Sequence, residues 1–196
     1  MMLSDPKVSI SQTRNSAAMP SPVEVGELYA AASAEAPLHE SPETAQVFAD
    51  LYAASLSRND LVAVSARAHD RLVGFAYGHP WRWVEQQDPW AQQLTERLGS
   101  RASALDNAFA LFLLAREPAD AFRGLGRAVL TEWMAGVGDH RVWLLTTDID
   151  SPARRLYSSF SFAPIGRGPD APDGAPGLVM LSGVRPGPAD RGTIGL

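Results

Sequence analysis

A glycine-bearing turn between a strongly apolar segment and an amphipathic segment constrains this chain most. Segment 108–115 is apolar throughout and indicates a buried strand. After it, apolar residues recur from Val129 to Val137 at helical spacing. Residues 123–128, Arg-Gly-Leu-Gly-Arg-Ala, join the two segments. The first turn of a helix has N–H groups without internal partners and carries partial positive charge, so this turn predicts an anion site.

Three phosphate-binding patterns compete for this turn. A P-loop needs a lysine directly after its last glycine, but the single lysine is Lys7, so this pattern is excluded. A dinucleotide-binding fingerprint needs glycine or alanine where Val129 stands, and it follows an early strand of its fold. Here the strand before the turn lies past the middle of the chain, so this pattern matches weakly. The third pattern is Arg/Gln-x-x-Gly-x-Gly/Ala, which Arg123, Gly126 and Ala128 match at every specified position. The turn therefore resembles the acetyl-CoA pyrophosphate site of the GNAT acetyltransferase superfamily.

Composition limits the other possibilities. The 196 residues suit one domain with a core, and we expect it over residues 8–182, with disordered ends at 1–7 and 183–196. The net charge of −5 argues against a nucleic-acid partner. The absence of cysteine excludes disulfides, a thiol nucleophile and cysteine metal sites. No run approaches the ~18 apolar residues of a membrane span. We expect a cytoplasmic protein without a membrane or metal partner.

The periodicity of the chain predicts alternating strands and helices. Expected strands are 8–14, 61–67, 72–77, 108–115, 141–147, 162–165 and 178–181, and expected helices are 23–34, 42–56, 89–98, 125–137 and 152–160. Segments 15–22, 99–107 and 166–177 are expected to be loops. The second helix should bury one stripe, formed by Val47, Phe48, Leu51, Tyr52 and Leu56. The four histidines do not have the spacing of metal ligands. We expect them on the surface or in turns, at His39, His69, His79 and His140.

A second motif follows one strand after the glycine turn. Residues 150–162 are similar to the GNAT sequence Asn-x-x-Ala-x-x-Leu-Tyr-x-x-x-Gly-Phe. The matching residues are Ala153, Leu156, Tyr157 and Phe162, and the two departures are Asp150 for asparagine and Ser161 for glycine. With both motifs the resemblance covers residues 8–182. It implies a mixed α/β fold whose central, mostly antiparallel sheet has six to seven strands and one splayed strand pair, flanked by helices.

The resemblance also implies where acetyl-CoA binds. In the family, the strand before the glycine turn bulges and splays from its neighbour, and its exposed backbone pairs with the pantetheine arm. The implied contacts here are Leu114, Ala115 and Arg116 for the pantetheine, the backbone of Gly124, Leu125, Gly126, Arg127 and Ala128 for the pyrophosphate, and the side chains of Arg123 and Asp150. The loop before Arg123 is two residues longer than in the family, so its backbone neighbours are the firmer part of this prediction.

Tyr157 resembles the general acid of the family. An amine attacks the thioester carbonyl, an oxyanion forms, and CoA leaves as a thiolate that a phenol with a pKa of ~10 can protonate. No carboxylate stands in an unmistakable position for a general base, and Asp106 and Asp148 are candidates. We expect an N-acetyltransferase that acts by direct attack in a ternary complex, on a primary amine of a small molecule or a peptide.

Two alternatives stay open on the sequence. One is a non-catalytic GNAT-like domain that binds acyl-CoA or a protein partner, which the departures at Asp150 and Ser161 motivate. The other is an enzyme with a longer acyl donor. Three tryptophans lie in an insertion relative to the minimal fold, namely Trp81, Trp83 and Trp90. We favour a core or homodimer role for them over a cover for the acceptor site.

Overall fold

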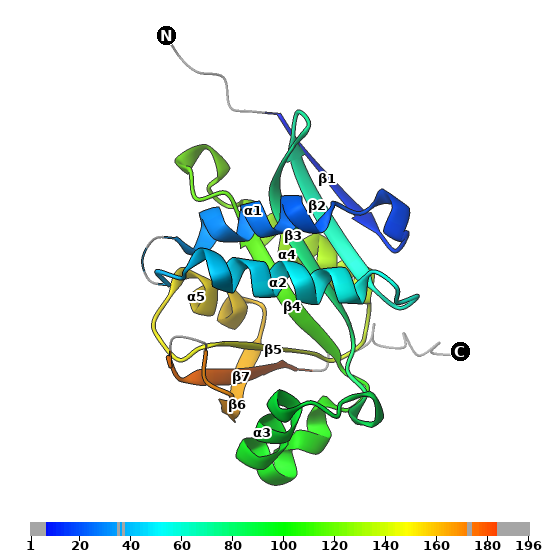
Figure 1. Ribbon diagram of the computed structural model, residues 1–196, viewed down its shortest axis with the longest axis vertical. Helices are drawn as coiled ribbons and strands as arrows, with labels where there is room; N and C mark the ends of the chain where they lie inside the picture. Colours follow the sequence, from blue (N-terminus) through cyan, green and yellow to red (C-terminus); the bar gives the residue numbers. More distant parts are fainter. Residues whose placement is uncertain (1–6, 35, 37, 172–173, 184–196) are drawn as a thin grey trace, which may run out of the picture.

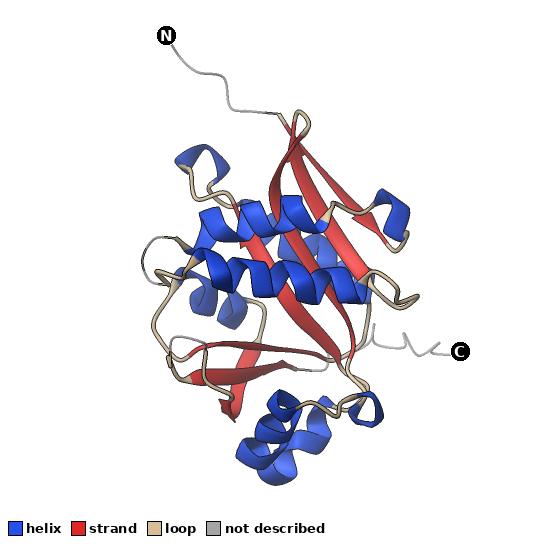
Figure 2. Cartoon of the chain, in the orientation of Figure 1, coloured by secondary structure: helices blue, strands red, loops and turns tan. Residues whose placement is uncertain are grey.

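A seven-stranded sheet forms the centre of the molecule in a computed structural model (Figures 1 and 2). The structure describes residues 7–34, 36, 38–171 and 174–183, so the predictions for 1–6 and 184–196 lie outside the described residues. The strands lie in the order β1-β2-β3-β4-β5-β7-β6. Their bounds are β1 Val8–Thr13, β2 Val62–Ala68, β3 Arg71–Pro80, β4 Phe109–Arg116, β5 Val142–Thr147, β6 Phe162–Gly168 and β7 Gly177–Ser182. Only the β4–β5 pair is parallel among the described strands, which confirms the predicted sheet.

Most of the described helices begin at a proline behind a polar cap. The bounds are α1 Pro22–Ser33, α2 Pro42–Ser55, α3 Pro89–Leu98, α4 Leu125–Val137 and α5 Pro152–Ser159. The caps accept a hydrogen bond from the N–H three residues later, and they are Ser21, Ser41, Asp88 and Ser151. Helix α4 differs, because Gly124 precedes it and offers no side chain. None of the described helices is long and apolar enough to cross a membrane.

Helices cover both faces of the sheet. In Figure 1, α1 and α2 lie in front of the strands and α4 lies behind them. Val25 of α1 and Tyr52 of α2 are buried against Phe75 of β3 on the front face. On the other face α4 buries Trp133, whose Nε1 donates a hydrogen bond to the Val62 carbonyl at 3.0 Å. The sheet is therefore covered on both sides, and its edges and strand ends are the places where a ligand can enter.

The tryptophan-rich insertion packs at one end of the sheet. Trp81 is 3% exposed and contacts Trp83, Trp90 and Trp143 edge-on. The predicted core role is confirmed for Trp81, whereas Trp90 is 36% exposed. A homodimer contact through these residues stays a prediction. Segment 99–107 was expected to be a loop, and this is wrong for Gly99–Leu105, which form a 3₁₀ helix that continues from α3.

The predicted apolar stripe of α2 is wrong at two positions. Val47 and Leu51 are half exposed, at 50% and 51%. The helix instead packs through Ala49 and Tyr52, because α1 approaches closely where it carries a glycine. A Cβ on Gly26 would lie 3.2 Å from the Cβ of Ala49. Close helix contact through small residues therefore turns the larger side chains outward.

His79 is also placed differently from its prediction. The residue is 7% exposed rather than on the surface or in a turn. Strand β3 continues to Pro80, beyond the predicted end at residue 77, and carries the imidazole against the ring of Phe112 at 4.5 Å. Burial lowers the pKa of His79, and its Nδ1 lies 3.0 Å from the Pro80 carbonyl oxygen. The side chain is therefore a neutral part of the core near the middle of β4.

Candidate active site

Strands β4 and β5 pair only at their beginnings. Segment 109–111 lies in register with segment 142–144. Beyond that point β4 stays with β3, whereas β5 continues along β7. Figure 1 shows the two strands diverging, so β4 has an open edge in its second half. The splayed pair implied by the sequence resemblance is present.

A β-bulge lies where the strands begin to diverge. Tyr77 of β3 is opposite Leu113 of β4, but the next residue, Gly78, is opposite Leu111. Phe112 is therefore the extra residue of the bulged strand. A bulge bends its strand and increases the local twist, which directs the second half of β4 away from β5.

The backbone of β4 presents alternate residues to the open edge. The Glu117 N–H donates to the Val73 carbonyl of β3 at 2.9 Å. Because backbone groups alternate along an antiparallel strand, Ala115 also faces β3, and Leu114 and Arg116 face the open edge. Two of the three residues predicted to meet the pantetheine arm thus present N–H and C=O groups there.

The start of α4 has amide groups without partners. Gly124 has a φ of +84°, a left-handed conformation that favours glycine. The N–H groups of Arg127 and Ala128 donate to the Gly124 carbonyl, at 3.1 and 3.2 Å. Within the described chain no hydrogen bond reaches the N–H groups of Gly124, Leu125 or Gly126. These three of the five predicted amides are available to an anion.

Two arginines border this helix start. The Cδ of Arg116 would lie 3.8 Å from a Cβ placed on Gly126, so its side chain passes over the turn. Arg127 donates from Nη2 to the Ser159 hydroxyl of α5 at 2.7 Å and lies over the Phe160 ring. Positive charge therefore lies on two sides of the free amides.

The other two predicted cofactor side chains are exposed and paired locally. Arg123 is 85% exposed and lies 3.3 Å from Asp120, three residues earlier. Asp150 is 81% exposed and pairs with Arg155 at 2.7 Å. Exposed pairs of this kind contribute little, so neither position is fixed by its partner. The anion site is built from backbone amides, and the roles of Arg123 and Asp150 stay predictions.

Helix α5 places Tyr157 beside the start of α4. Leu156 would contact a Cβ on Gly126 at 3.8 Å, which puts the two helices next to each other. Tyr157 is 8% exposed and packs edge-on against Phe162, with ring centroids 6.0 Å apart. Burial raises the pKa of Tyr157 to about 12. The phenol is protonated throughout the neutral range, which is the state that a general acid requires.

Known structures share this architecture, although no protein-family model and no curated protein matches the sequence. A GNAT-family protein from Desulfovibrio desulfuricans is 21% identical, with a TM-score of 0.61 over 91% of this chain and 100% of its own. The ribosomal-protein-S18-alanine N-acetyltransferase from Escherichia coli is 16% identical, with a TM-score of 0.55 over 94% and 98%. The PaiA N-acetyltransferase from Thermoplasma acidophilum, in complex with coenzyme A, is 14% identical, with a TM-score of 0.55 over 89% and 98%.

The chain has the GNAT fold. Its second motif departs from the GNAT pattern at Ser161, where glycine is usual, yet the backbone keeps a φ of +64° there. Serine at a positive φ is strained, so the chain retains the turn that glycine would make. Ala153, which matches the motif, is exposed rather than on the buried face of α5. The departure at Ser161 therefore leaves the path into β6 unchanged.

The two candidate bases have structural partners in this GNAT fold. Asp106 is exposed and accepts a hydrogen bond from the Trp83 N–H at 3.3 Å. Asp148 is exposed and pairs with Arg154 at 2.7 Å. Each carboxylate thus already has a hydrogen-bonding or ionic partner, and nothing in the structure favours either as the base.

The sequence analysis missed Tyr29, which interacts with Tyr157, and Glu40, which lies next to Tyr29. Tyr29 of α1 is buried, which raises its pKa well above the usual range, and the adjacent Glu40 and the charge of Tyr157 raise it further. The side chain of Tyr29 therefore connects α1 with α5. The only signal in the sequence was that Glu40 directly precedes the Ser41 cap, which does not tell what its carboxylate faces.

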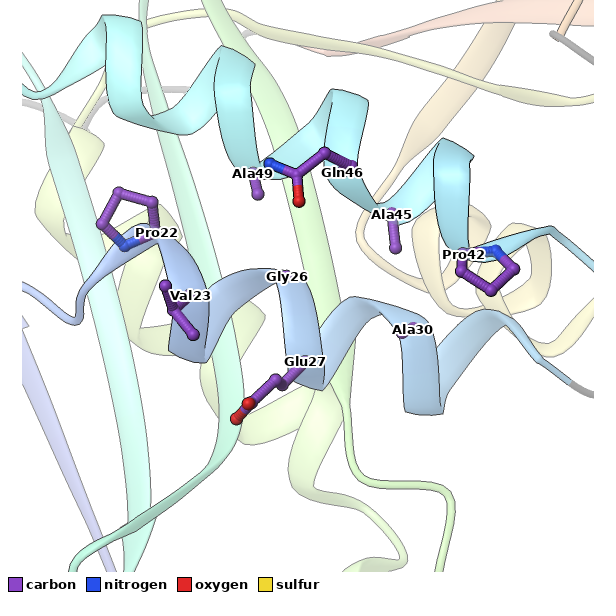
Figure 3. Close-up of a pocket in the computed structure, with 9 residues that line it drawn as sticks. All are labelled: Pro22, Val23, Gly26, Glu27, Ala30, Pro42, Ala45, Gln46 and Ala49. Carbon is purple, nitrogen blue, oxygen red and sulfur yellow. The ribbon is translucent and has the colours of Figure 1, made fainter.

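A groove of about 280 Å³ runs along the contact between α1 and α2 (Figure 3). Its walls are mostly small or apolar residues, namely Pro22, Val23, Gly26, Ala30, Pro42, Ala45 and Ala49, with Glu27 and Gln46. In Figure 3 the Glu27 carboxylate points away from α2. The groove contains none of the predicted site residues, so we place the candidate active site at the splayed strands.

Proposed function

We propose that this protein is an N-acetyltransferase that binds acetyl-CoA between β4 and β5 and transfers the acetyl group to a primary amine. The observation that carries the proposal is the set of unpartnered amides at the start of α4, which borders the open edge of β4 and lies beside Tyr157. The coenzyme A complex of a protein with this fold supports it.

The residues at the turn fit a pyrophosphate. The amides of Gly124, Leu125 and Gly126 point from a helix N-terminus, where the dipole favours an anion. A hydrogen bond to a charged group contributes about 1.5–3 kcal/mol, so several together support ordinary cofactor affinity. The open backbone groups of Leu114 and Arg116 offer the pantetheine amides a strand-like partner.

Tyr157 supplies the proton of the transfer step. The neutral amine nitrogen forms a bond to the acetyl carbon, the carbon–sulfur bond breaks, and the phenol donates its proton to the departing sulfur. The nitrogen releases its extra proton to water, and the phenolate takes up a proton from water. With its pKa at about 12, the phenol keeps this proton until charge develops on sulfur. No cysteine exists to carry an acetyl group, so we propose direct attack with both substrates bound, the acceptor being a small molecule or a peptide.

Calorimetric titration with acetyl-CoA tests the binding half of the proposal. Gly126→Glu places a side chain and a negative charge at the free amides, and we expect its affinity to fall at least about 100-fold. Ala135→Glu adds the same charge at an exposed position of the same helix, and we expect it to bind as the parent does.

Equal affinities for the parent and the folded Gly126→Glu protein would overturn the assignment of this turn. Titration with longer acyl-CoAs in the same series tells which acyl chain the open edge of β4 accommodates. A parent protein that binds acetyl-CoA but acetylates no amine would instead support a non-catalytic acyl-CoA-binding domain.

A further inference from the structure

One carboxylate oxygen near the candidate active site has neither solvent nor a donor. Oε2 of Glu40 is buried, and no donor of a described residue lies within hydrogen-bond distance of this atom, although the Tyr29 hydroxyl is close enough to the carboxylate for Glu40 to raise the pKa of Tyr29. A buried carboxylate oxygen without a donor is costly, because it loses water and gains nothing in exchange. An atom in this state in a folded protein calls for an explanation, and a ligand is one.

Backbone contacts hold Glu40 in this position. Its N–H donates to the Ser33 carbonyl at 3.0 Å, which ties the end of the α1–α2 connection to the last turn of α1. Ser41, the next residue, caps α2 through the Thr44 N–H. The backbone of Glu40 is thus placed by two helix ends, and no cation of a described residue pairs with its carboxylate.

The two arginines that precede Tyr157 in α5 pair with other carboxylates. Arg154 pairs with Asp148 and Arg155 with Asp150. Among the described residues, no ion pair includes Glu40. Its negative charge therefore has no counter-charge within the described chain.

Two tyrosines link Glu40 to the site of transfer. The Tyr29 phenol lies next to the Glu40 carboxylate and also interacts electrostatically with Tyr157. Tyr29 is held in place by burial and by the Phe48 ring, whose centroid is 4.3 Å from its own. Tyr29 thus interacts both with the unpaired carboxylate and with the proposed general acid.

We propose that Glu40 binds the protonated amino group of the acceptor, which enters from the side of α1 and α2. A primary ammonium has three N–H donors and a positive charge, which satisfy the bare Oε2 and neutralise the carboxylate. Before the nitrogen attacks the thioester, the bound ammonium releases one proton to water, which frees its lone pair. The proposal rests on the proposed function and adds to it the charge of the acceptor, its direction of entry and the residue that recognises it.

Matched amines and alcohols test this charge requirement. The probes are 2-phenylethylamine against 2-phenylethanol, and n-butylamine against 1-butanol, each titrated into the coenzyme A-loaded protein and followed by saturation-transfer NMR. We expect the parent to bind each amine at least about tenfold more tightly than its alcohol. Glu40→Gln keeps the shape of the side chain and should remove this preference.

A control variant separates a local effect from a change in overall charge. Glu27→Gln removes the same charge from an exposed position of α1 and should keep the preference for amines. For any amine that is acetylated, Glu40→Gln should raise KM with little change in kcat, since the interaction is made with the bound acceptor.

The outcomes distinguish this inference from the proposed function. Acetyl-CoA affinity measured on the same Glu40→Gln protein reports that the cofactor site and the fold are intact. A parent that binds coenzyme A but shows no preference for the amines, or a preference that survives in Glu40→Gln, overturns the assignment of Glu40 and leaves cofactor binding standing. A parent that binds no acyl-CoA at all overturns the proposed function.

Discussion

At the scale of single residues, removal of the Tyr157 hydroxyl should affect catalysis without affecting stability. Its hydroxyl makes no hydrogen bond to a described residue, and burial alone accounts for its raised pKa. Tyr157→Phe should therefore leave the free energy of unfolding nearly unchanged. In the proposed reaction the same change removes a proton donor, so we expect kcat to fall by about 10²–10⁴ with acetyl-CoA affinity retained.

Tyr52→Phe is the matched control for this prediction. The Tyr52 hydroxyl donates to the Pro20 carbonyl at 2.9 Å, so its removal should lower the free energy of unfolding by about 1 kcal/mol. Turnover per folded molecule should stay at the parent value. Stopped-flow or steady-state assays of thiol release, together with urea unfolding of both variants, measure the contrast, and parental kcat in Tyr157→Phe would remove the tyrosine from the mechanism.

The sequence located some of these residues and missed others for a physical reason. The sequence motifs identified Gly124, Gly126 and Tyr157, because the turn and the helix start that position them are determined by residues adjacent in the sequence. Glu40 depends on the helix that follows it and on Tyr29, eleven residues earlier. What a side chain faces across the fold is fixed by tertiary packing, which no local pattern records.

At the scale of elements, the bulge in β4 depends on the glycine opposite it. A Cβ on Gly78 would overlap the Ala110 carbonyl oxygen and lie 2.6 Å from the Trp133 ring. Neither atom belongs to the end of a flexible side chain, so the Gly78→Ala substitution must displace β3, β4 or α4. We expect a loss of at least about 1–3 kcal/mol in the free energy of unfolding, measured by urea denaturation.

Gly183→Ala provides the comparison for that loss. No atom outside its chain neighbours lies within 4 Å of a Cβ at Gly183, so the midpoint of its urea transition should match that of the parent. If Gly78→Ala proved as stable as Gly183→Ala, the close approach of β3, β4 and α4 would be wrong, and with it the origin of the splay.

The sequence predicted the elements better than their arrangement. Proline behind Ser41 or Ser151 predicts where a helix begins, and both starts are confirmed. The divergence of β4 from its neighbour followed only from the family resemblance, and the parallel pairing with β5 was not predicted, because strand order is not encoded in local periodicity. The predicted stripe of α2 failed at Val47 and Leu51 since the contact with α1 runs through smaller residues.

At the scale of the whole molecule, a ring of four charged side chains joins the loop that follows α2 to the segment that follows β3. Arg58 contacts Asp60 with two nitrogens, at 2.9 and 3.1 Å, and Arg82 contacts the same carboxylate at 2.8 Å. Glu85 closes the ring by accepting from both arginines. The end of α2 is thereby linked to the start of the tryptophan-rich insertion, so two of the clusters that cover the sheet are held together at its end.

Burial of the tyrosines gives the molecule a predictable response to alkaline pH. All four are described, and burial raises the pKa of each above the ordinary value of about 10, to about 12 for Tyr157. A group whose pKa is higher in the folded state stabilises the fold fully below its unfolded pKa. That contribution is lost as the pH rises through the folded value.

The free energy of unfolding should therefore have no tyrosine-dependent slope below about pH 9, and should fall steadily above about pH 10. Because the chain has no cysteine and Lys7 is its single lysine, few other groups titrate in this interval. Near-ultraviolet absorbance reports phenolate directly, and the native protein should show almost none at a pH where the urea-unfolded protein is half ionised. If phenolate appeared near pH ~10 while the circular dichroism spectrum remained native, tyrosines of the core would be open to water. Repeating the titration on Tyr157→Phe would then show whether the phenol proposed as general acid is one of them.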